Sequence, residues 1–238
     1  MSIVSLIDHA VLHPTQTGDD LRDACGFCIE LGAASVCVKP SMVALASELL
    51  ADSKVMASTV IGFPHGGTTT ATKVRETEVA CSEGAAEVDM VVNLGRVFAE
   101  DWQAVEQDIR EVVEAAKSGG AITKVIFETG LLPNDDVKRR LCELSESAGA
   151  AFVKTSTGFG MVKNEDGSMR STGATEHDIK LMRETCSEAV EVKASGGIRS
   201  YEDAKRLVDL GATRLGASST KAIAAGEQGS ETVSKADY

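Results

Sequence analysis

The sequence predicts an α/β fold in which eight strand–helix units close into a single (β/α)8 TIM barrel. Short β-rich runs alternate with amphipathic helical stretches along the whole chain of 238 residues. Eight such units average about 30 residues each, which is the usual size of a strand–helix–strand step. Gly-Ala pairs mark a helix end before every second strand, as at Gly32-Ala33 and Gly149-Ala150. An open doubly wound sheet is the lesser alternative.

Each strand is predicted from a short run rich in β-branched and other apolar residues. The predicted strands are 5–12, 35–39, 54–62, 87–93, 122–129, 151–157, 190–195 and 213–217. Helical patterns lie between them; over 101–117, for example, apolar residues recur at three- and four-residue spacing. No linker separates a second domain, so we expect the barrel to span 1–225 and a flexible polar tail to span 226–238.

The composition excludes several classes of partner. The chain has 36 acidic against 24 basic residues and a net charge of −12 without a basic cluster, so we expect no nucleic-acid or membrane-surface binding. The N-terminal segment lacks a signal-peptide pattern, and we expect a cytoplasmic protein. The six cysteines are expected to be reduced, buried thiols. Cys25 and Cys28 formally match C-x-x-C, but they lie in a helical pattern without a second pair to complete a zinc site.

Four predicted strands carry an ionisable residue where a barrel strand is ordinarily apolar. These residues are Asp89, Lys124, Lys154 and Lys193, on the fourth to the seventh strand. Each has a valine neighbour. If the valines face the helices, the two-residue alternation of a strand directs all four charges into the barrel.

Buried lysines beside a carboxylate suggest a chemistry. Burial and a neighbouring cation both disfavour the ammonium form, so at least one lysine should have a lowered pKa and act as an amine nucleophile. A neutral amine forms a Schiff base with a carbonyl, and the iminium accepts electrons from the adjacent carbon–carbon bond. A structural ion-pair network is the alternative. Three lysines outnumber the one strand aspartate, however, which favours catalysis.

Two loops predicted at the same end of the barrel have a composition suited to phosphate. Gly196 and Gly197 follow the seventh strand, and Ser218 and Ser219 follow the eighth and open a helix. In this architecture, backbone N–H groups, hydroxyls and a helix N-terminus in these loops commonly bind phosphate. The histidines do not have the spacing of metal ligands, so we expect neither a metal nor another cofactor.

From Asp8 to Tyr238 the sequence resembles the deoxyribose-phosphate aldolases, which are class I aldolases on a TIM barrel. The most specific segments are Phe152 to Phe159 (FVKTSTGF), Val192 to Gly197 (VKASGG) and Gly62 to Gly66 (GFPHG). The resemblance implies reversible cleavage of the phosphosugar 2-deoxyribose 5-phosphate to glyceraldehyde 3-phosphate and acetaldehyde. Two alternatives stay open: a related lysine-dependent aldolase with another aldehyde or sugar-phosphate substrate, and a non-catalytic phosphosugar-binding barrel.

The resemblance also implies roles for individual residues. The implied catalytic residues are Lys154 as the Schiff-base lysine, Lys193 and Asp89 in proton transfer, and the terminal Tyr238 as a proton relay. The implied substrate-binding residues are Asp8, Lys124 and Thr157. The implied phosphate-binding residues are Gly158, Gly196, Gly197, Ser218 and Ser219.

Two features depart from the family pattern. The loop 161–170, which follows the strand of the implied nucleophile, is longer, and this puts substrate preference in doubt. Lys39 stands where an uncharged residue is expected; we interpret it as a solvated rim lysine, with a second anion contact as the alternative. A homo-oligomer is compatible with the sequence, which does not fix the oligomeric state.

Overall fold

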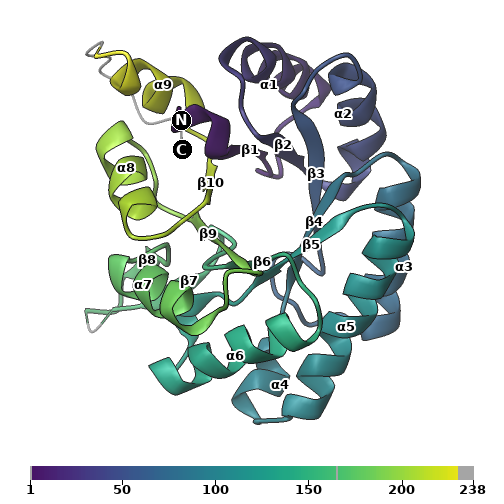
Figure 1. Cartoon of the computed structure of the whole chain (residues 1–238), viewed down its shortest axis with the longest axis vertical. Coiled ribbons are helices and arrows are strands. Elements are labelled where there is room, and N and C mark those ends of the chain that lie inside the picture. The colour runs from purple at the N-terminus through teal and green to yellow at the C-terminus, as the bar shows by residue number, and fades with distance from the viewer. Residues whose placement is uncertain (1, 165, 230–238) are drawn as a thin grey trace.

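The computed structural model describes residues 2–164 and 166–229. Within them, eight parallel strands close into a barrel in the order β1-β10-β9-β6-β5-β4-β3-β2, as Figure 1 shows. The strands are β1 (Ile7–Val11), β2 (Ser35–Val38), β3 (Met56–Ile61), β4 (Glu87–Val91), β5 (Ile122–Ile126), β6 (Phe152–Lys154), β9 (Glu191–Ser195) and β10 (Arg214–Ala217). Every predicted strand overlaps one of these, so the predicted TIM barrel is confirmed and the open sheet is wrong.

Helices surround the barrel (Figure 1). They are α1 (Gly18–Leu31), α2 (Val43–Leu50), α3 (Thr70–Ser82), α4 (Leu94–Phe98), α5 (Trp102–Ser118), α6 (Asp135–Ser147), α7 (Glu176–Thr185), α8 (Tyr201–Asp209) and α9 (Thr220–Glu227). Short 3-10 turns occupy Val4–Leu6, Pro40–Met42 and Thr129–Leu131. Several helices begin at a polar cap; Thr17 forms a capping box with Asp20, and Asn134 and Ser200 each accept a backbone N–H.

The apolar core lies between the strands and the helices. Val88, Val125, Val153 and Val192 are fully buried in it, each beside an ionisable neighbour in the chain. The ionisable side chains take the opposite face because successive residues of a strand alternate. The parallel register pairs Asp89 with Lys124 and Lys154 with Lys193, so the charges come together inside the barrel.

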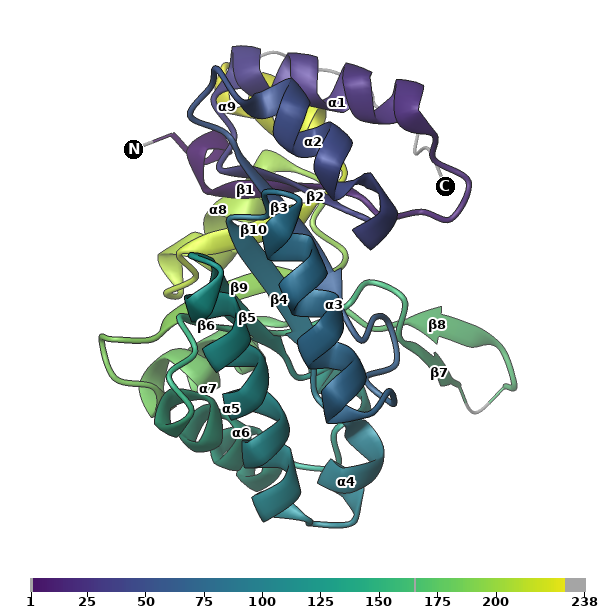
Figure 2. The same ribbon diagram turned by 90° about the vertical axis from the view of Figure 1, so that its right-hand side faces the viewer.

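The segment after β6 is a hairpin, and the sequence had suggested only a loop. β7 (Met161–Lys163) pairs with β8 (Met169–Ser171) in antiparallel fashion. Figure 2 shows this hairpin projecting away from the body of the barrel. Gly167 closes the turn at φ +85, a conformation that favours glycine. The Asp166-Gly167 pair between two short β-like runs is a hairpin signal that explains the difference.

Other sequence predictions concern thiols, the tail and membranes. Cys25 and Cys28 lie buried within α1, and burial raises the pKa of their thiols to about 11 and about 12 respectively, as for packed rather than reactive cysteines. α9 ends at Glu227, and Tyr238 lies outside the described residues. Across the helices of the described residues, none has the length and apolar character to cross a bilayer.

Candidate active site

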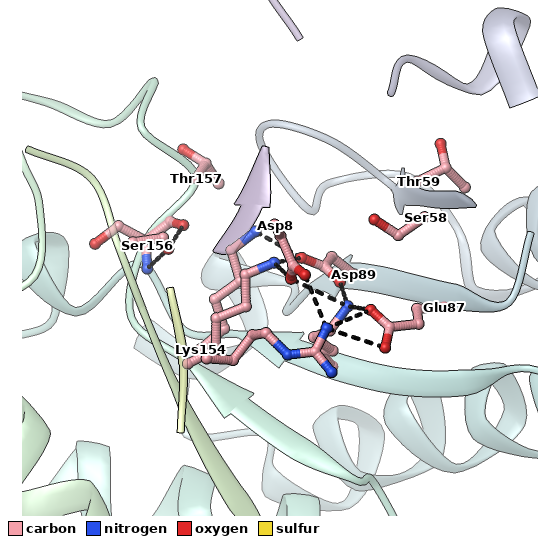
Figure 3. Close-up of polar contacts among 12 residues, drawn as sticks. Asp8, Ser58, Thr59, Glu87, Asp89, Lys154, Ser156 and Thr157 are labelled. Carbon is pink, nitrogen blue, oxygen red and sulfur yellow. Dashed lines mark hydrogen bonds and ion pairs between the residues drawn. The ribbon is translucent and has the colours of Figure 1, made fainter. Parts of the chain in front are cut away.

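A cluster of ionisable side chains fills the interior of the barrel. Its members, none with a side chain more than 13% exposed, are Asp8, Glu87, Asp89, Lys124, Lys154, Lys193 and Arg214. Figure 3 shows Asp8, Glu87, Asp89 and Lys154 converging at its centre. Three carboxylates thus face four cations, which corrects the expectation of one strand aspartate against three lysines. No role was predicted for Glu87 or Arg214 from the sequence, although Glu87 lies two residues before Asp89 and shares its face of the strand.

Asp89 is the centre of this cluster. Its Oδ1 lies 2.7 Å from Lys124 Nζ, and its Oδ2 lies 2.8 Å from Lys154 Nζ and 2.7 Å from Lys193 Nζ. Burial opposes its charge, but the three lysines outweigh burial and hold the pKa of Asp89 well below its usual range. Asp89 is therefore an ionised carboxylate that holds three lysine ammonium groups around it.

The three lysines differ in the number of carboxylates around them. Lys124 Nζ lies within 3.6 Å of three carboxylates, and Lys193 Nζ contacts two. Within the described residues, Lys154 Nζ contacts a single carboxylate, Asp89, through the oxygen that Lys193 also uses. Lys154 is therefore the least compensated ammonium of the cluster.

This imbalance separates the pKa values of the lysines. Burial lowers the pKa of Lys154, the nearby Lys193 lowers it further, and Asp89 opposes the shift only in part. Burial also disfavours the ammonium forms of Lys124 and Lys193, but their carboxylates outweigh burial and raise the pKa of each. Lys154 is thus the lysine that most readily becomes a neutral amine, which is the form a nucleophile requires.

Asp8 and Lys124, both predicted to bind substrate, lie inside the ion network. Asp8 is 1% exposed; it accepts hydrogen bonds from Ser35 Oγ at 2.7 Å and Arg214 Nη1 at 2.8 Å, and it also pairs with Lys193. The neighbouring cations outweigh burial and hold the pKa of Asp8 below its usual range. Asp8 thus pairs with cations of the cluster and Lys124 with its carboxylates, and their contact with substrate stays a prediction.

Hydroxyls tie the loop after β6 to the end of β9. Thr155 Oγ1 donates to the carbonyl of Ser195 at 3.0 Å and accepts its N–H at 3.0 Å. Ser195 Oγ in turn donates to the carbonyl of Ser156 at 2.6 Å. Thr157 lies buried at the same end of the barrel, with its hydroxyl donating to Glu128. The strands of Lys154 and Lys193 are therefore fixed to each other just beyond the two lysines.

The loops predicted to bind phosphate follow β6, β9 and β10, which are neighbours in the barrel. Gly158 has φ +84 and Gly197 φ +82, and a Cβ added to either would face open space. Ligand atoms can therefore approach this backbone closely. Ser219 caps α9 without using its hydroxyl for the cap, so that hydroxyl remains available to a ligand.

A separate cavity of about 620 Å³ lies beside these loops. Gly196 and Gly197 line one side of it. The rest is lined by residues of α6, α7 and α8, such as Lys138, by Thr172 at the base of the β7–β8 hairpin, and by Gly130, which packs against Thr172. None of the barrel lysines borders it. The cavity therefore lies outside the ion cluster and shares only the glycine pair with the predicted phosphate loops.

Lys39 has a structural task that the sequence did not indicate. Its ammonium donates to the carbonyls of His13 at 3.1 Å, Pro14 at 3.3 Å and Gln16 at 2.6 Å. These three bonds use all three donors of an ammonium group. Lys39 therefore closes the loop between β1 and α1, and the prediction of a solvated rim lysine is wrong.

The histidines and acidic residues show no cation site within the described ranges, where no group of three or more His, Cys, Asp or Glu side chains is placed to hold a metal ion. His9 lies on the outer side of β1, with its Nδ1 2.9 Å from Thr220 Oγ1 and its ring against Phe27. Burial lowers the pKa of His9 to about 4, so it is a neutral, packed side chain.

A (β/α)8 barrel with a buried lysine of lowered pKa on its inner wall is typical of the class of lysine-dependent barrel aldolases. The chain belongs to the DeoC/LacD family of aldolases, whose model matches residues 2–229. The resemblance seen in the sequence is thereby confirmed.

Relatives and solved structures agree with this assignment. The deoxyribose-phosphate aldolase of Bacillus cytotoxicus is 50% identical over 223 residues, which are 94% of this chain and 95% of that protein. The crystal structure of a putative deoxyribose-phosphate aldolase from Coccidioides immitis has a TM-score of 0.86 and 40% identity, over 93% of this chain and 84% of that one. The deoxyribose phosphate aldolase of Aeropyrum pernix, described as a unique tetrameric structure, has a TM-score of 0.83 and 31% identity, over 93% and 89%.

Proposed function

We propose that this chain is a class I aldolase that reversibly cleaves 2-deoxy-D-ribose 5-phosphate to D-glyceraldehyde 3-phosphate and acetaldehyde. Relatives named deoxyribose-phosphate aldolase align over nearly the whole chain. One observation carries the mechanism: Lys154 has a lowered pKa, and its single carboxylate contact within the described residues is an oxygen of Asp89 that it shares with Lys193. A non-catalytic phosphosugar-binding barrel is not favoured, because binding a phosphate does not require a buried neutral amine.

In the first step, the neutral Nζ of Lys154 attacks the aldehyde carbon of the open-chain sugar. One proton passes from the nitrogen to the former carbonyl oxygen, which gives a carbinolamine. That oxygen then takes up a second proton from an acid and leaves as water, and a protonated iminium remains on Lys154. Lys193 supports this step because its raised pKa keeps it an ammonium that can donate the proton. Asp89 contacts both amines and can pass protons between them.

In the second step, the iminium draws electrons from the bond between C2 and C3 of the sugar. The C3 hydroxyl loses its proton, C3 becomes the aldehyde of glyceraldehyde 3-phosphate, and an enamine remains on Lys154. Protonation at C2 and addition of water then release acetaldehyde and the free lysine. Tyr238, which lies outside the described residues, is our proposed relay for the proton at C2.

The phosphate group is proposed to bind the loops after β6, β9 and β10. The residues concerned are Gly158, Gly196, Gly197, Ser218 and Ser219. Gly158 and Gly197 face open space, and α9 begins at Thr220, directly after the serines, so N–H groups and hydroxyls can converge on an anion. We also propose that Thr157, Asp8 and Lys124 contact the sugar.

The proposed partners are the phosphosugar and further copies of this chain. A homo-oligomer is supported by the tetramer named for the Aeropyrum pernix relative. The cytoplasm is the proposed location, supported by six free cysteines, five of which are buried. The acidic net charge of −12 argues against nucleic acid or anionic membranes as partners.

Acetaldehyde release from 2-deoxyribose 5-phosphate tests the activity. Borohydride added with substrate should inactivate the enzyme by reducing the iminium, and peptide mapping should find the adduct on Lys154. Treatment with a chelator should leave turnover unchanged. Absence of turnover would contradict the proposed substrate, and an adduct on Lys193 or Lys124 would contradict the assigned nucleophile.

A further inference from the structure

Glu128 is a buried carboxylate at the mouth of the barrel, two residues after β5 ends. It is 2% exposed, and its backbone lies in the left-handed region at φ 56. Within the described residues, Glu100 is the other non-glycine residue with positive φ, and its side chain is exposed. A buried carboxylate at an unfavourable backbone conformation requires strong partners.

Hydroxyl and amide groups from two segments supply those partners. Glu128 Oε2 accepts the N–H of Thr157 at 3.2 Å and also the Thr157 hydroxyl, while Oε1 accepts the hydroxyl of Thr172 at 3.1 Å. Thr157 lies three residues after Lys154, and Thr172 directly follows β8. One carboxylate therefore joins the loop after the nucleophile's strand to the base of the β7–β8 hairpin.

Close packing holds this arrangement in place. A Cβ added to Gly160 would lie 2.4 Å from Thr172 Oγ1 and 2.7 Å from Glu128 Cδ. A Cβ added to Gly130 would lie 2.5 Å from the Cβ of Thr172. Both glycines therefore pack directly against Thr172, and Gly160 also packs against the Glu128 carboxylate, so a side chain at either position would displace these groups.

The hydrogen bonds fix what the Thr157 hydroxyl can offer to a ligand. Its proton is donated to Glu128, and its oxygen accepts the N–H of Phe159 at 2.9 Å. A hydroxyl has one proton and two lone pairs, so one acceptor position remains. Towards a substrate, Thr157 can therefore act only as an acceptor, and its partner must be a donor such as a sugar hydroxyl.

We propose that Glu128 is a positioning residue of the aldolase site, which holds Thr157 as an acceptor for a substrate hydroxyl and couples the β7–β8 hairpin to that threonine. The proposal rests on the proposed contact between Thr157 and the sugar. Glu128 has no contact with the ion cluster, so its effect is on substrate binding and not on the formation of the neutral amine.

Two substitutions of Glu128 separate this role from a merely structural one. In Glu128→Gln, the amide oxygen can accept both Thr157 donors, and the amide NH2 can donate to Thr172, whose hydroxyl then donates to the Gly160 carbonyl 3.2 Å away. Glu128→Leu keeps similar bulk but removes every hydrogen bond. Glu100→Leu is the matched control, because it makes the same exchange at φ 55 on an exposed residue.

We expect Glu128→Leu to raise KM for 2-deoxyribose 5-phosphate about tenfold or more, since three bonds to a charged acceptor are lost. Its pH–rate profile and borohydride adduct on Lys154 should match those of the wild type. Glu128→Gln should keep KM within about threefold, and Glu100→Leu should leave KM unchanged. An unchanged KM in Glu128→Leu, or a KM in Glu128→Gln as high as in Glu128→Leu, would overturn the proposal.

Two threonine variants test the contacts of Glu128 with Thr157 and with Thr172 separately. Thr172→Val should speed tryptic cleavage at Lys163 and Arg170 of the hairpin and raise KM less than Glu128→Leu does. Thr157→Val should raise KM as much as Glu128→Leu does. The double variant Glu128→Leu/Thr157→Val should raise KM no further than either single variant. Additive effects would refute the coupling. If Glu128→Leu fails to fold, Glu128→Gln and Thr157→Val still decide the matter, while trapping on wild-type Lys154 tests the proposed function independently.

Discussion

Two buried lysines with lowered pKa lie in different regions of this molecule. Lys154 lies on the inner wall of the barrel, whereas Lys73 lies on α3 between the barrel and the helices. Lys73 is fully buried; its Nζ lies 2.5 Å from Asp108 Oδ2 and 2.8 Å from the carbonyl of Val91. Burial lowers the pKa of Lys73, and Asp108 opposes the shift.

The difference between these regions lies in how each carboxylate is shared. Within the described residues, Asp108 pairs with one lysine, whereas the carboxylate of Asp89 serves three. Lys73 is therefore held in a closed ion pair, and Lys154 competes for its partner. A lowered pKa by itself reports burial; a shared carboxylate on the wall of a catalytic barrel indicates a reactive amine.

Lys154→Met is expected to have the largest effect, lowering kcat by about 10⁴-fold or more because no other amine replaces the nucleophile. Borohydride with substrate should no longer inactivate the variant, and its circular dichroism should match the wild type. Residual turnover above about 1% would show that another lysine forms the Schiff base.

Lys193→Leu should lower kcat by about 10²-fold or more through the loss of a proton donor. It also removes a cation that lowers the pKa of Lys154 and leaves Asp89 Oδ2 to Lys154 alone, so the pKa of Lys154 rises. Because the neutral amine is the reactive form, the rising limb of the pH–rate profile should move to higher pH. A limb that stays in place would refute the electrostatic role of Lys193.

Deletion of Tyr238 should lower kcat by about tenfold or more, because the proposed proton relay would be lost. The melting temperature should stay nearly unchanged. Such a relay can serve Lys154 but not Lys73, which is enclosed by helices. Equal turnover in the truncated and full-length chains would remove Tyr238 from the proposed site.

Lys73→Met should have the smallest effect on turnover, with kcat within about threefold of the wild type, although it should destabilise the fold by about 3–5 kcal/mol. The loss of stability arises because Asp108 stays buried without its partner. Denaturant unfolding measures it, and adding Asp108→Leu should restore most of the stability. A large loss of kcat in a folded Lys73→Met variant would contradict the contrast between the two lysines.

The sequence predicted the barrel and much of the ion cluster because both follow from short-range periodicity. Alternation along each strand was enough to predict that Asp89, Lys124, Lys154 and Lys193 meet inside the barrel, and the structure confirms it. The same alternation places Glu87 on the inner face of its strand. A charge at the start of a strand is usually solvated, however, so the sequence alone does not mark Glu87 as buried.

Contacts between distant segments could not be predicted in the same way. The pair of Lys73 and Asp108 joins helices that are 35 residues apart in the chain, and nothing in either helix pattern specifies the partner. Glu128 likewise depends on Thr172, 44 residues away and beyond an inserted hairpin. Such pairs are selected by tertiary packing, which a single sequence does not report.

The base of the β7–β8 hairpin is closed by a backbone hydrogen bond, which affects how the sequence of this barrel can change. The N–H of Thr172 donates to the carbonyl of Gly160 at 2.9 Å, so the segment between them leaves and re-enters the barrel at nearly one point. Chain inserted between two such neighbours can change in length and sequence while the strands that carry the lysines keep their places. We therefore expect that the segment between Gly160 and Thr172 can be exchanged without displacing the barrel lysines, as long as these two residues are kept. Hairpins of other lengths and sequences joined at these two residues could then be screened for new aldehyde acceptors, with the melting temperature as the check that the barrel is retained.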